Sequence, residues 1–330
     1  MEERIDILLA TYNGEKYLAE QINSILNQTY KNIKLIISDD GSNDKTIEIL
    51  KQYEQKDNRI ELHLQRKNLG VVKNIEFLMQ QVESPYYMLA DQDDFWMPEK
   101  VEKSFETLKS KNADLVFGDL EVVDENLNTI YPSFNNYMLL TRKINKYINS
   151  YELNYLYNCI TGCTVLAKKE TIDYILPLPT ISKHLIHDYW IGIMVSLNGK
   201  LGYMPEKYIK YRQHGNNQVG TDKISHGFKK LEQVRNLFIE VKLGIFKTYV
   251  ENNTRFPENL QNLNIKAYEY YKMIEKKKNF NFKGWTTFHK LYKTEKFMYY
   301  LENFLIMNMP LISRGLFKIR YLILKFLKKR

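Results

Sequence analysis

The chain has 330 residues, a length that suits one large domain or two ordinary ones. Hydrophobic residues make up 44% of it and charged residues 26%, which excludes an intrinsically disordered or collagen-like protein. We expect no secretory signal, because two acids in MEERIDILLA precede the first apolar run, and the uncharged run at 303–313 is too short to span a bilayer. Cys159 and Cys163 are too few for a disulfide framework and only a weak metal signal, so we expect two small, half-buried residues in a reducing compartment.

The net charge of +9 is unevenly distributed along the chain. Residues 1–224 hold 26 basic and 31 acidic residues, a net charge of −5. Residues 225–330 hold 22 basic and 8 acidic residues, a net charge of +14. This asymmetry predicts a catalytic or binding domain over 1–224 and a basic module over 225–330 that seeks an anionic surface.

Short apolar runs alternate with amphipathic stretches over the first 120 residues. The runs that predict strands are Ile5–Ala10, Leu35–Ser38, Ile60–Leu64, Tyr86–Ala90 and Leu115–Phe117. The stretches with helical spacing are Glu15–Leu26, Lys45–Gln55, Val71–Val82 and Glu99–Ser110. This alternation predicts an α/β, Rossmann-like fold with a doubly wound, mostly parallel sheet, whose ligands bind beyond the carboxyl ends of the strands.

The alternation lapses after Asp119. Residues 125–160, rich in Asn and Tyr, predict a loop-and-helix excursion. An apolar run, a helix and a short strand follow, at Cys163–Ala167, Asp188–Leu197 and Gly202–Met204. From about Ser225 the sequence becomes helical, basic and aromatic, which predicts a C-terminal helical module.

Two polar segments follow the first and second predicted strands. Thr11 and Tyr12 precede Asn13-Gly14, and Asp39 and Asp40 precede Gly41-Ser42. Side chains at two neighbouring strand ends could hold the hydroxyls and base of a nucleoside, although ordinary turn chemistry explains either segment alone. Neither segment matches a dinucleotide or phosphate-binding glycine loop, so NAD enzymes and P-loop NTPases are disfavoured.

Three carboxylates follow the fourth predicted strand within four residues: Asp91, Asp93 and Asp94. If strand geometry continues, Asp91 and Asp93 point to the same side. Carboxylates this close repel one another, and bound Mg²⁺ or Mn²⁺ would relieve that repulsion and leave coordination positions for phosphate oxygens. The alternative is a solvated acidic turn that caps the next helix.

The motifs LLATYNGEKYL, SILNQTY, LIISDDGSNDKT, RKNLGVVKN and LADQDDFWMPEK, in this order and spacing, resemble the inverting family 2 glycosyltransferases, which have the GT-A fold. The resemblance covers roughly residues 4–215. It implies that Tyr12 and Asp40 hold the nucleobase of a nucleotide-sugar donor, with Thr11 and Asp39 beside them. It also implies that Asp91 and Asp93 form the D-x-D motif and that Asp93 ligates the metal directly.

The segment His187-Asp188-Tyr189-Trp190 stands where the family places its general base. The resemblance assigns this role to Asp188, although His187 replaces a frequent Glu. A helix N-terminus would lower the pKa of Asp188, so burial must offset this effect if the base is strong. Alternatively, Asp188 only caps the helix, and His187 either orients Asp188 or the acceptor or is an ordinary loop residue.

A second motif, Tyr211–Asn217, predicts a polar loop near the end of the catalytic domain. The resemblance implies that His214 joins Asp93 on the metal, which would favour Mn²⁺ over Mg²⁺, and that Arg212 approaches the diphosphate. A surface turn is the alternative. Arg66 and Asn68 are weaker candidates for donor contacts. Gly162 lies in a segment that resembles the small-residue segment lining the acceptor side in relatives, where close backbone approach explains the glycine.

The last 20 residues, 311–330, contain seven basic residues and no acid. At helical spacing, one face is apolar and the opposite face is basic. This pattern is typical of an interfacial helix on anionic lipid, although a helix docked on the protein body would show it too. No nucleic-acid motif accompanies the basic residues, so we expect no nucleic-acid partner.

The resemblance, together with the basic C-terminal segment, implies metal-dependent inverting transfer from a nucleotide-diphosphate sugar to a lipid-linked saccharide, at the inner face of the cell membrane in bacterial polysaccharide or capsule synthesis. ATYNGEKYL, DQDDFW and RQHGNN look most like a rhamnosyltransferase-like branch, which implies dTDP-L-rhamnose, whereas similar relatives use UDP-hexoses. The alternative is a non-catalytic, membrane-bound saccharide-binding or scaffold protein that retains the fold.

Overall fold

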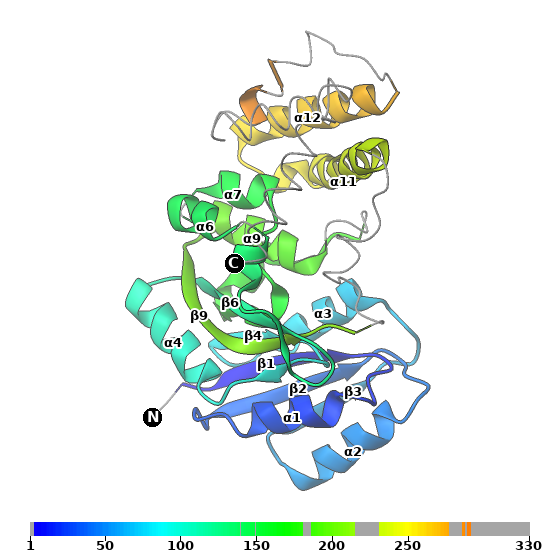
Figure 1. Cartoon of the computed structure of the whole chain (residues 1–330), viewed down its shortest axis with the longest axis vertical. Coiled ribbons are helices and arrows are strands. Elements are labelled where there is room, and N and C mark those ends of the chain that lie inside the picture. The colour runs from blue at the N-terminus through cyan, green and yellow to red at the C-terminus, as the bar shows by residue number, and fades with distance from the viewer. Residues whose placement is uncertain are drawn as a thin grey trace. The chain divides into compact units, whose positions relative to one another are not determined.

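A curled, mostly parallel sheet forms the centre of the N-terminal part of the chain (Figure 1). The computed structural model of the chain describes residues 3–138, 140–148, 150–180, 186–214, 231–276, 286–287 and 289–291. Within these ranges nine strands pair in the order β3-β2-β1-β4-β8-β6-β9-β5, with β7 on β6. The strands are β1 (Ile5–Thr11), β2 (Ile33–Asp39), β3 (Ile60–Leu64), β4 (Tyr86–Ala90), β5 (Phe95–Trp96), β6 (Leu115–Val123), β7 (Thr129–Tyr131), β8 (Leu166–Lys168) and β9 (Leu201–Arg212).

The helices fall in two groups along the described chain. Those around the sheet are α1 (Leu18–Leu26), α2 (Thr46–Lys56), α3 (Val71–Gln80), α4 (Lys100–Lys111), α5 (Phe134–Tyr137), α6 (Thr141–Tyr147), α7 (Tyr151–Leu156), α8 (Ile172–Ile175) and α9 (His187–Asn198), with short 3₁₀ turns at Gly162–Thr164 and Lys169–Thr171. Those beyond the sheet are α11 (Leu231–Glu251) and α12 (Glu258–Lys276), with a 3₁₀ turn at Asn253–Arg255 between them. The predicted order of strands and helices over the first 120 residues is confirmed, except that the short strand β5, which we did not predict, lies between β4 and α4.

Alternation along the parallel strands β1 to β4 distributes their side chains between two apolar layers. Ile5, Ile7 and Leu9 of β1 belong to a core that also contains buried residues of α1, α2 and α4. Leu8 points to the opposite face of the sheet, where α3 packs on β1 and β2. Burial on both faces explains why these strands are continuous apolar runs rather than alternating ones.

Strand β9 is longer than its sequence predicted and curves strongly around one side of the sheet (Figure 1). Its first part pairs with β6 up to Gly118 and Met204, and the ladder then resumes at Asp119 and Lys207. The intervening Pro205 has no N–H to donate, so a bulge at this point is the expected result. The strand therefore continues to Arg212, and the predicted loop begins later than we expected.

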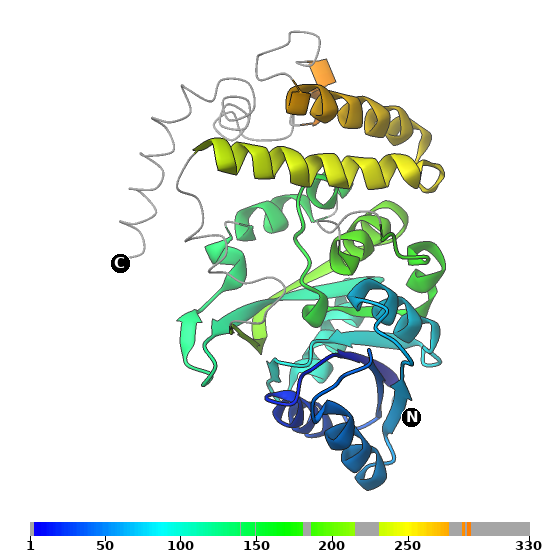
Figure 2. The same cartoon turned by 90° about the vertical axis from the view of Figure 1, so that its right-hand side faces the viewer.

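The described residues divide into two compact units, one up to position 214 and one from position 231. In the second unit α11 and α12 lie side by side (Figures 1 and 2). Phe246 of α11 stacks on Tyr271 of α12 with ring centroids 5.4 Å apart, so aromatic packing joins the two helices. The described helices include none that is both long and apolar enough to cross a membrane. The predicted boundary at 224/225 and the segment 311–330 lie outside the described residues.

Candidate active site

Strands β1, β2 and β4 end side by side at one edge of the sheet. In the parallel ladder Thr11 lies opposite Asp39, and Ala90, the last residue of β4, lies opposite Leu9. The polar segments that follow these strands therefore meet, as expected for a doubly wound sheet. This edge is the candidate active site.

Asp39 shapes the first part of the site from a fully buried position. Its carboxylate accepts hydrogen bonds from the hydroxyl of Thr11 at 3.0 Å and from the amide of Ser42 at 2.9 Å. These bonds join the ends of β1 and β2 and fix the turn that follows β2. The side chain of Tyr12 is 45% exposed and lies at the rim of the site.

Asp40 connects the same turn to the segment before α3. Its two carboxylate oxygens accept from the amides of Leu69 at 2.6 Å and Gly70 at 2.9 Å, at the N-terminus of α3. The exposed Arg66 and Asn68 belong to the loop that Asp40 holds, so the structure brings these weaker donor-binding candidates to the same edge.

Gln92 is a site residue that the sequence reasoning missed. Its amide oxygen accepts from the backbone N–H of Tyr12 at 2.9 Å, and its amide nitrogen donates to the carbonyl of Tyr12 at 3.1 Å. A Cβ on Gly14 would lie 2.3 Å from Oε1 of Gln92, so only glycine leaves room for this contact. Gln92 therefore joins the loop after β1, which is the candidate nucleoside loop, to the loop of residues 91–94 after β4, which is the acidic loop.

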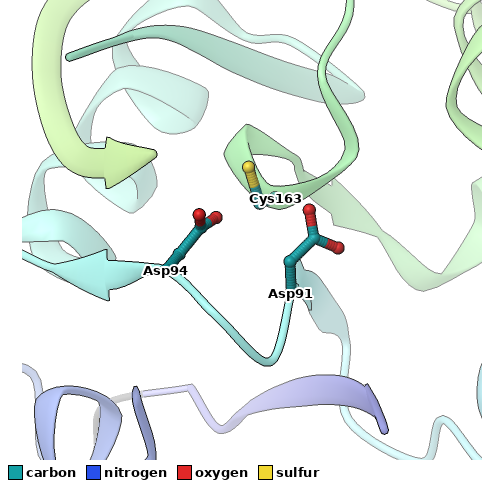
Figure 3. Close-up of side chains that lie close together, drawn as sticks. All are labelled: Asp91, Asp94 and Cys163. Carbon is teal, nitrogen blue, oxygen red and sulfur yellow. The ribbon is translucent and has the colours of Figure 1, made fainter. Parts of the chain in front are cut away.

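The chain turns directly after β4, and as a result the three predicted carboxylates do not all face the same neighbour. Asp91 and Asp94 point toward Cys163, and ligand atoms of these three residues lie within 4.8 Å of one another (Figure 3). Asp93 instead contacts His214, with 2.8 Å between Oδ2 and Nε2. We expected Asp91 and Asp93 to point to the same side if the strand continued through them. The strand ends at Ala90, so this condition is not met. The expectation of two half-buried cysteines was wrong, because both Cys159 and Cys163 are buried.

The carboxylates of Asp91 and Asp94 are costly to ionise in the protein alone. Burial raises the pKa of Asp91 to about 7, and the charges of Asp93 and Asp188 act in the same direction. Burial also raises the pKa of Asp94 well above its ordinary value. Among the described residues, Oδ2 of Asp94 has no hydrogen-bond partner. A positive charge in this loop would stabilise the ionised carboxylates.

The residues present fit a divalent cation. A carboxylate and an imidazole are ordinary ligands for Mn²⁺, and two ligands about 2.1 Å from one ion at right angles lie about 3 Å apart. The 2.8 Å between Asp93 and His214 is close to this separation. The orphaned carboxylate oxygen of Asp94 indicates a further unmet demand for positive charge nearby.

Lys100 is a second buried charge-bearing group near the acidic loop. It begins α4, and its Nζ lies 3.2 Å from the ring centroid of Trp96. Burial lowers its pKa to about 7, against the opposing influence of Asp94 and Asp91. Nζ has no hydrogen-bond partner among the described residues, so Lys100 balances the buried carboxylates through its charge and not through a hydrogen bond.

Asp188 lies in the first turn of α9 and is buried. Its Oδ1 accepts from Nδ2 of Asn158 at 3.1 Å and from the amide of Tyr189 at 2.6 Å. Burial nevertheless prevails over these hydrogen bonds and raises the pKa of Asp188. A Cβ on Gly162 would lie 3.6 Å from Cβ of Asp188, and the adjacent Cys163 lies beside Asp91 and Asp94, so Asp188 belongs to the same site as the acidic loop. Sequence reasoning missed Asn158, which no local pattern marks.

His187 precedes Asp188 and packs against the small-residue segment. A Cβ on Gly162 would lie 3.0 Å from Nε2 of His187, which agrees with the expected close backbone approach at this glycine. Burial lowers the pKa of His187, against the opposing influence of Asp188.

Arg212 lies buried at the end of β9 with its guanidinium held inside the protein. Nε donates to the carbonyl of Asp93 at 2.9 Å, and the guanidinium forms an ion pair with Glu20. Cζ of the guanidinium lies 4.4 Å from the ring centroid of Tyr17. Its backbone N–H donates to Asp94 at 3.3 Å. The approach of Arg212 to a diphosphate stays a prediction, and the observed contacts hold the acidic loop.

The profile of the family described as "Glycosyl transferase family 2" matches residues 6–174, about half of the chain. The chain belongs to this family. It is therefore a glycosyltransferase, as the motifs predicted. The dTDP-rhamnosyl transferase RfbG of Shigella flexneri is 29% identical over 241 residues, which span 69% of this chain and 79% of that protein.

Solved structures show that the fold of this glycosyltransferase is GT-A. The structure of S. aureus TarS 1–349 with UDP-GlcNAc aligns with a TM-score of 0.56 at 18% identity, covering 81% of this chain and 72% of that chain. The mannosyltransferase PcManGT from Pyrobaculum calidifontis, solved with GDP-Man and Mn²⁺, aligns with a TM-score of 0.53 at 10% identity, covering 90% and 77%.

Proposed function

We propose that this glycosyltransferase moves a sugar from a nucleotide-diphosphate sugar to an acceptor hydroxyl with inversion and with the help of a divalent cation. The observation that carries the proposal is that two adjacent residues place Asp188 beside the acidic loop. A Cβ on Gly162 would lie 3.6 Å from Cβ of Asp188, and ligand atoms of Cys163 lie within 4.8 Å of those of Asp91 and Asp94. An inverting transfer needs a base and a stabilised leaving group at the same anomeric carbon. Asp188 and the acidic loop supply groups suited to these two tasks.

Asp188 takes the proton of the acceptor hydroxyl in the proposed reaction. Its raised pKa makes the carboxylate a stronger base than an ordinary Asp, while the donors Asn158 and Tyr189 N–H keep it oriented. Both effects follow from burial at the start of α9. His187 next to it acts against burial and lowers the pKa of Asp188, but burial prevails.

Asp93 and His214 would hold the cation, with Asp91 and Asp94 beside them. The bound ion supplies positive charge that neutralises the leaving diphosphate. The imidazole of His214 favours Mn²⁺ over Mg²⁺. The nucleoside and its diphosphate would be surrounded by residues of the loops after β1 and β2 and of the loop before α3: Thr11, Tyr12, Asp39, Asp40, Arg66 and Asn68.

The donor that the comparisons support best is dTDP-L-rhamnose, because the relative RfbG is named a dTDP-rhamnosyl transferase. A UDP-hexose is the second candidate, since the structural neighbour TarS was solved with UDP-GlcNAc. We further propose a lipid-linked saccharide acceptor for bacterial surface polysaccharide or capsule, reached from the inner face of the cell membrane. The basic, amphipathic sequence of 311–330 supports this location.

A donor panel tests the proposal. The protein is incubated with Mn²⁺ and with dTDP-L-rhamnose, UDP-glucose, UDP-galactose or UDP-GlcNAc, and release of nucleotide diphosphate is measured with and without lipid-linked acceptors. We expect release with one nucleotide class and loss of release on chelation. Absence of binding and release across dTDP and UDP donors would overturn the proposed donor class.

Two variants separate the proposed roles within the same assay. Asp93→Ala should weaken donor binding, because the cation loses a ligand. Asp188→Asn should bind the donor normally and lose turnover by about 10²–10⁴-fold, the usual contribution of a general base. Near-normal turnover of Asp188→Asn would assign the base to another residue.

A further inference from the structure

Helix α1 and the residues directly after it carry buried polar side chains on the face that packs against the rest of the protein, where apolar side chains are the usual choice. Gln21, Ser24 and Gln28 are spaced by three and four residues, so they share one face of the helix and its C-terminal extension. All three are buried, and both glutamines are fully so. Burying an amide costs free energy unless it is hydrogen-bonded, so these residues require specific partners.

Besides bonds to one another, these residues have partners on the segment from the acidic loop to α4. Gln21 donates through Nε2 to the carbonyl of Asp91 at 2.8 Å. Ser24 accepts from the amide of Trp96 at 3.1 Å. Gln28 lies farther along, where its amide donates to the carbonyl of Met97 at 2.8 Å and accepts from an amide in the first turn of α4 at 3.0 Å. This face of α1 is therefore hydrogen-bonded to the chain at several points between Asp91 and the first turn of α4.

The D-x-D turn itself is held at each of its three residues by groups from other elements. Gln21 holds the carbonyl of Asp91, and Arg212 holds the carbonyl of Asp93 at 2.9 Å. Gln92, between them, is paired through its side chain with the backbone of Tyr12. Anchoring through carbonyls leaves the carboxylates of the turn available, which is the arrangement that preorganised metal sites need.

We propose that Gln21 is a positioning residue for the metal-binding turn, with a task distinct from that of Gln28, which anchors the far end of the segment. The inference rests on the proposed metal dependence. Gln21 is fully buried, and it acts through the backbone of Asp91. Its effect should therefore appear in the affinity for the cation before any chemistry takes place.

Gln21→Met and the matched control Gln28→Met test this role. Both replace a fully buried amide by an apolar side chain of similar size, so both should lower the urea midpoint of unfolding. Binding of Mn²⁺ alone is followed by the loss of the free-ion EPR signal on titration into the full-length protein. We expect Gln21→Met to bind Mn²⁺ about 10–100-fold more weakly, the usual loss when a group that orients a metal ligand is removed, and Gln28→Met to bind like the unaltered protein.

The outcomes are distinguishable. Equal Mn²⁺ affinity of Gln21→Met and the unaltered protein overturns the positioning role, and so does an equal loss in both variants, which would mean general loosening. If the unaltered protein binds no Mn²⁺, the proposed metal dependence fails as well. Gln21→Asn, whose shorter side chain keeps an amide but does not reach Asp91, replaces Gln21→Met if the latter does not fold.

Discussion

Asp188 combines burial, which raises its pKa, with hydrogen bonds that stabilise its charged form. A base of this kind needs both influences, because burial alone would leave a protonated and freely rotating acid. Asn158 is the neutral donor in this balance, 3.1 Å from Oδ1, and it comes from the segment between α7 and the 3₁₀ turn. The basicity of Asp188 is thus set by residues 30 positions away as well as by its own helix.

Removing the Asn158 donor should move the pH dependence of the reaction. In Asn158→Ala the charged form of Asp188 loses a hydrogen bond, so its pKa rises further. The base works only when deprotonated. The fall of activity at low pH should therefore begin at a higher pH than in the unaltered protein, with turnover largely recovered at high pH.

The measurement is the pH profile of kcat/KM at saturating Mn²⁺, which keeps the acidic loop ionised. The profile of Asp188→Asn serves as the control, because a variant without the base should lose this acidic limb. A rate that is reduced equally at every pH in Asn158→Ala would show that Asn158 only supports the fold.

At the scale of elements, the site depends on contacts between loops that follow different strands. The loop after β1 and the loop after β4 are joined by the paired hydrogen bonds between Gln92 and Tyr12, 80 positions apart. Gly14 makes this contact possible because a Cβ there would displace the amide of Gln92. The loop after β2 is joined to the start of α3 through Asp40.

Gly14→Ala should weaken donor binding with little effect on global stability. The added Cβ meets the end of a flexible side chain, which can move away, but the two hydrogen bonds to Tyr12 are then lost. At about 0.5–1.5 kcal/mol for each bond, we expect the donor KM to rise about tenfold. Donor titrations and urea unfolding of the same preparations measure the two effects.

Gly202→Ala is the matched control for this prediction. Its Cβ would lie 2.8 Å from Cγ1 of Val116 inside the sheet, so it should destabilise the fold by overpacking while leaving the donor KM unchanged. A donor KM that is unaltered in Gly14→Ala would mean that the Gln92 bridge does not shape the nucleotide site.

At the scale of the whole molecule, charge and chemistry are separated along the chain. The candidate site residues all lie at or before position 214, whereas the net charge of +14 lies in residues 225–330. In the described part of that region, α11 and α12 pair through aromatic residues such as Phe246 and Tyr271. The segment that we predict to contact lipid follows them in the sequence, at 311–330.

Truncation after Pro310 should release the protein from anionic vesicles while the donor-binding site stays folded. Each basic residue near an anionic surface contributes about 1 kcal/mol, which salt weakens, and the apolar face adds binding that salt does not remove. Flotation of full-length and truncated protein on anionic and neutral liposomes, at low and high salt, measures both contributions. If the two proteins float equally poorly on anionic vesicles, 311–330 is an ordinary helix of the protein body.

The sequence by itself determined the strand order of the N-terminal half, the edge at which the site lies and the residue types that gather there. Continuous apolar runs and the polar residues at their ends are local features, so β3 (Ile60–Leu64) and β4 (Tyr86–Ala90) could be placed with their observed bounds. The acidic run after β4 could be assigned to the site for the same reason, because the assignment required only that a predicted strand end directly before it.

Only the tertiary structure decided how the polar groups are paired. Asp91 faces Cys163, Asp93 faces His214, and Gln21 holds the carbonyl of Asp91, each across a long stretch of sequence. Strand β9 reaches Arg212 because it finds ladder partners in β6 and β5, which its own composition does not reveal. A buried polar group takes its partner from whichever distant segment packs beside it, and local periodicity carries no information about that choice.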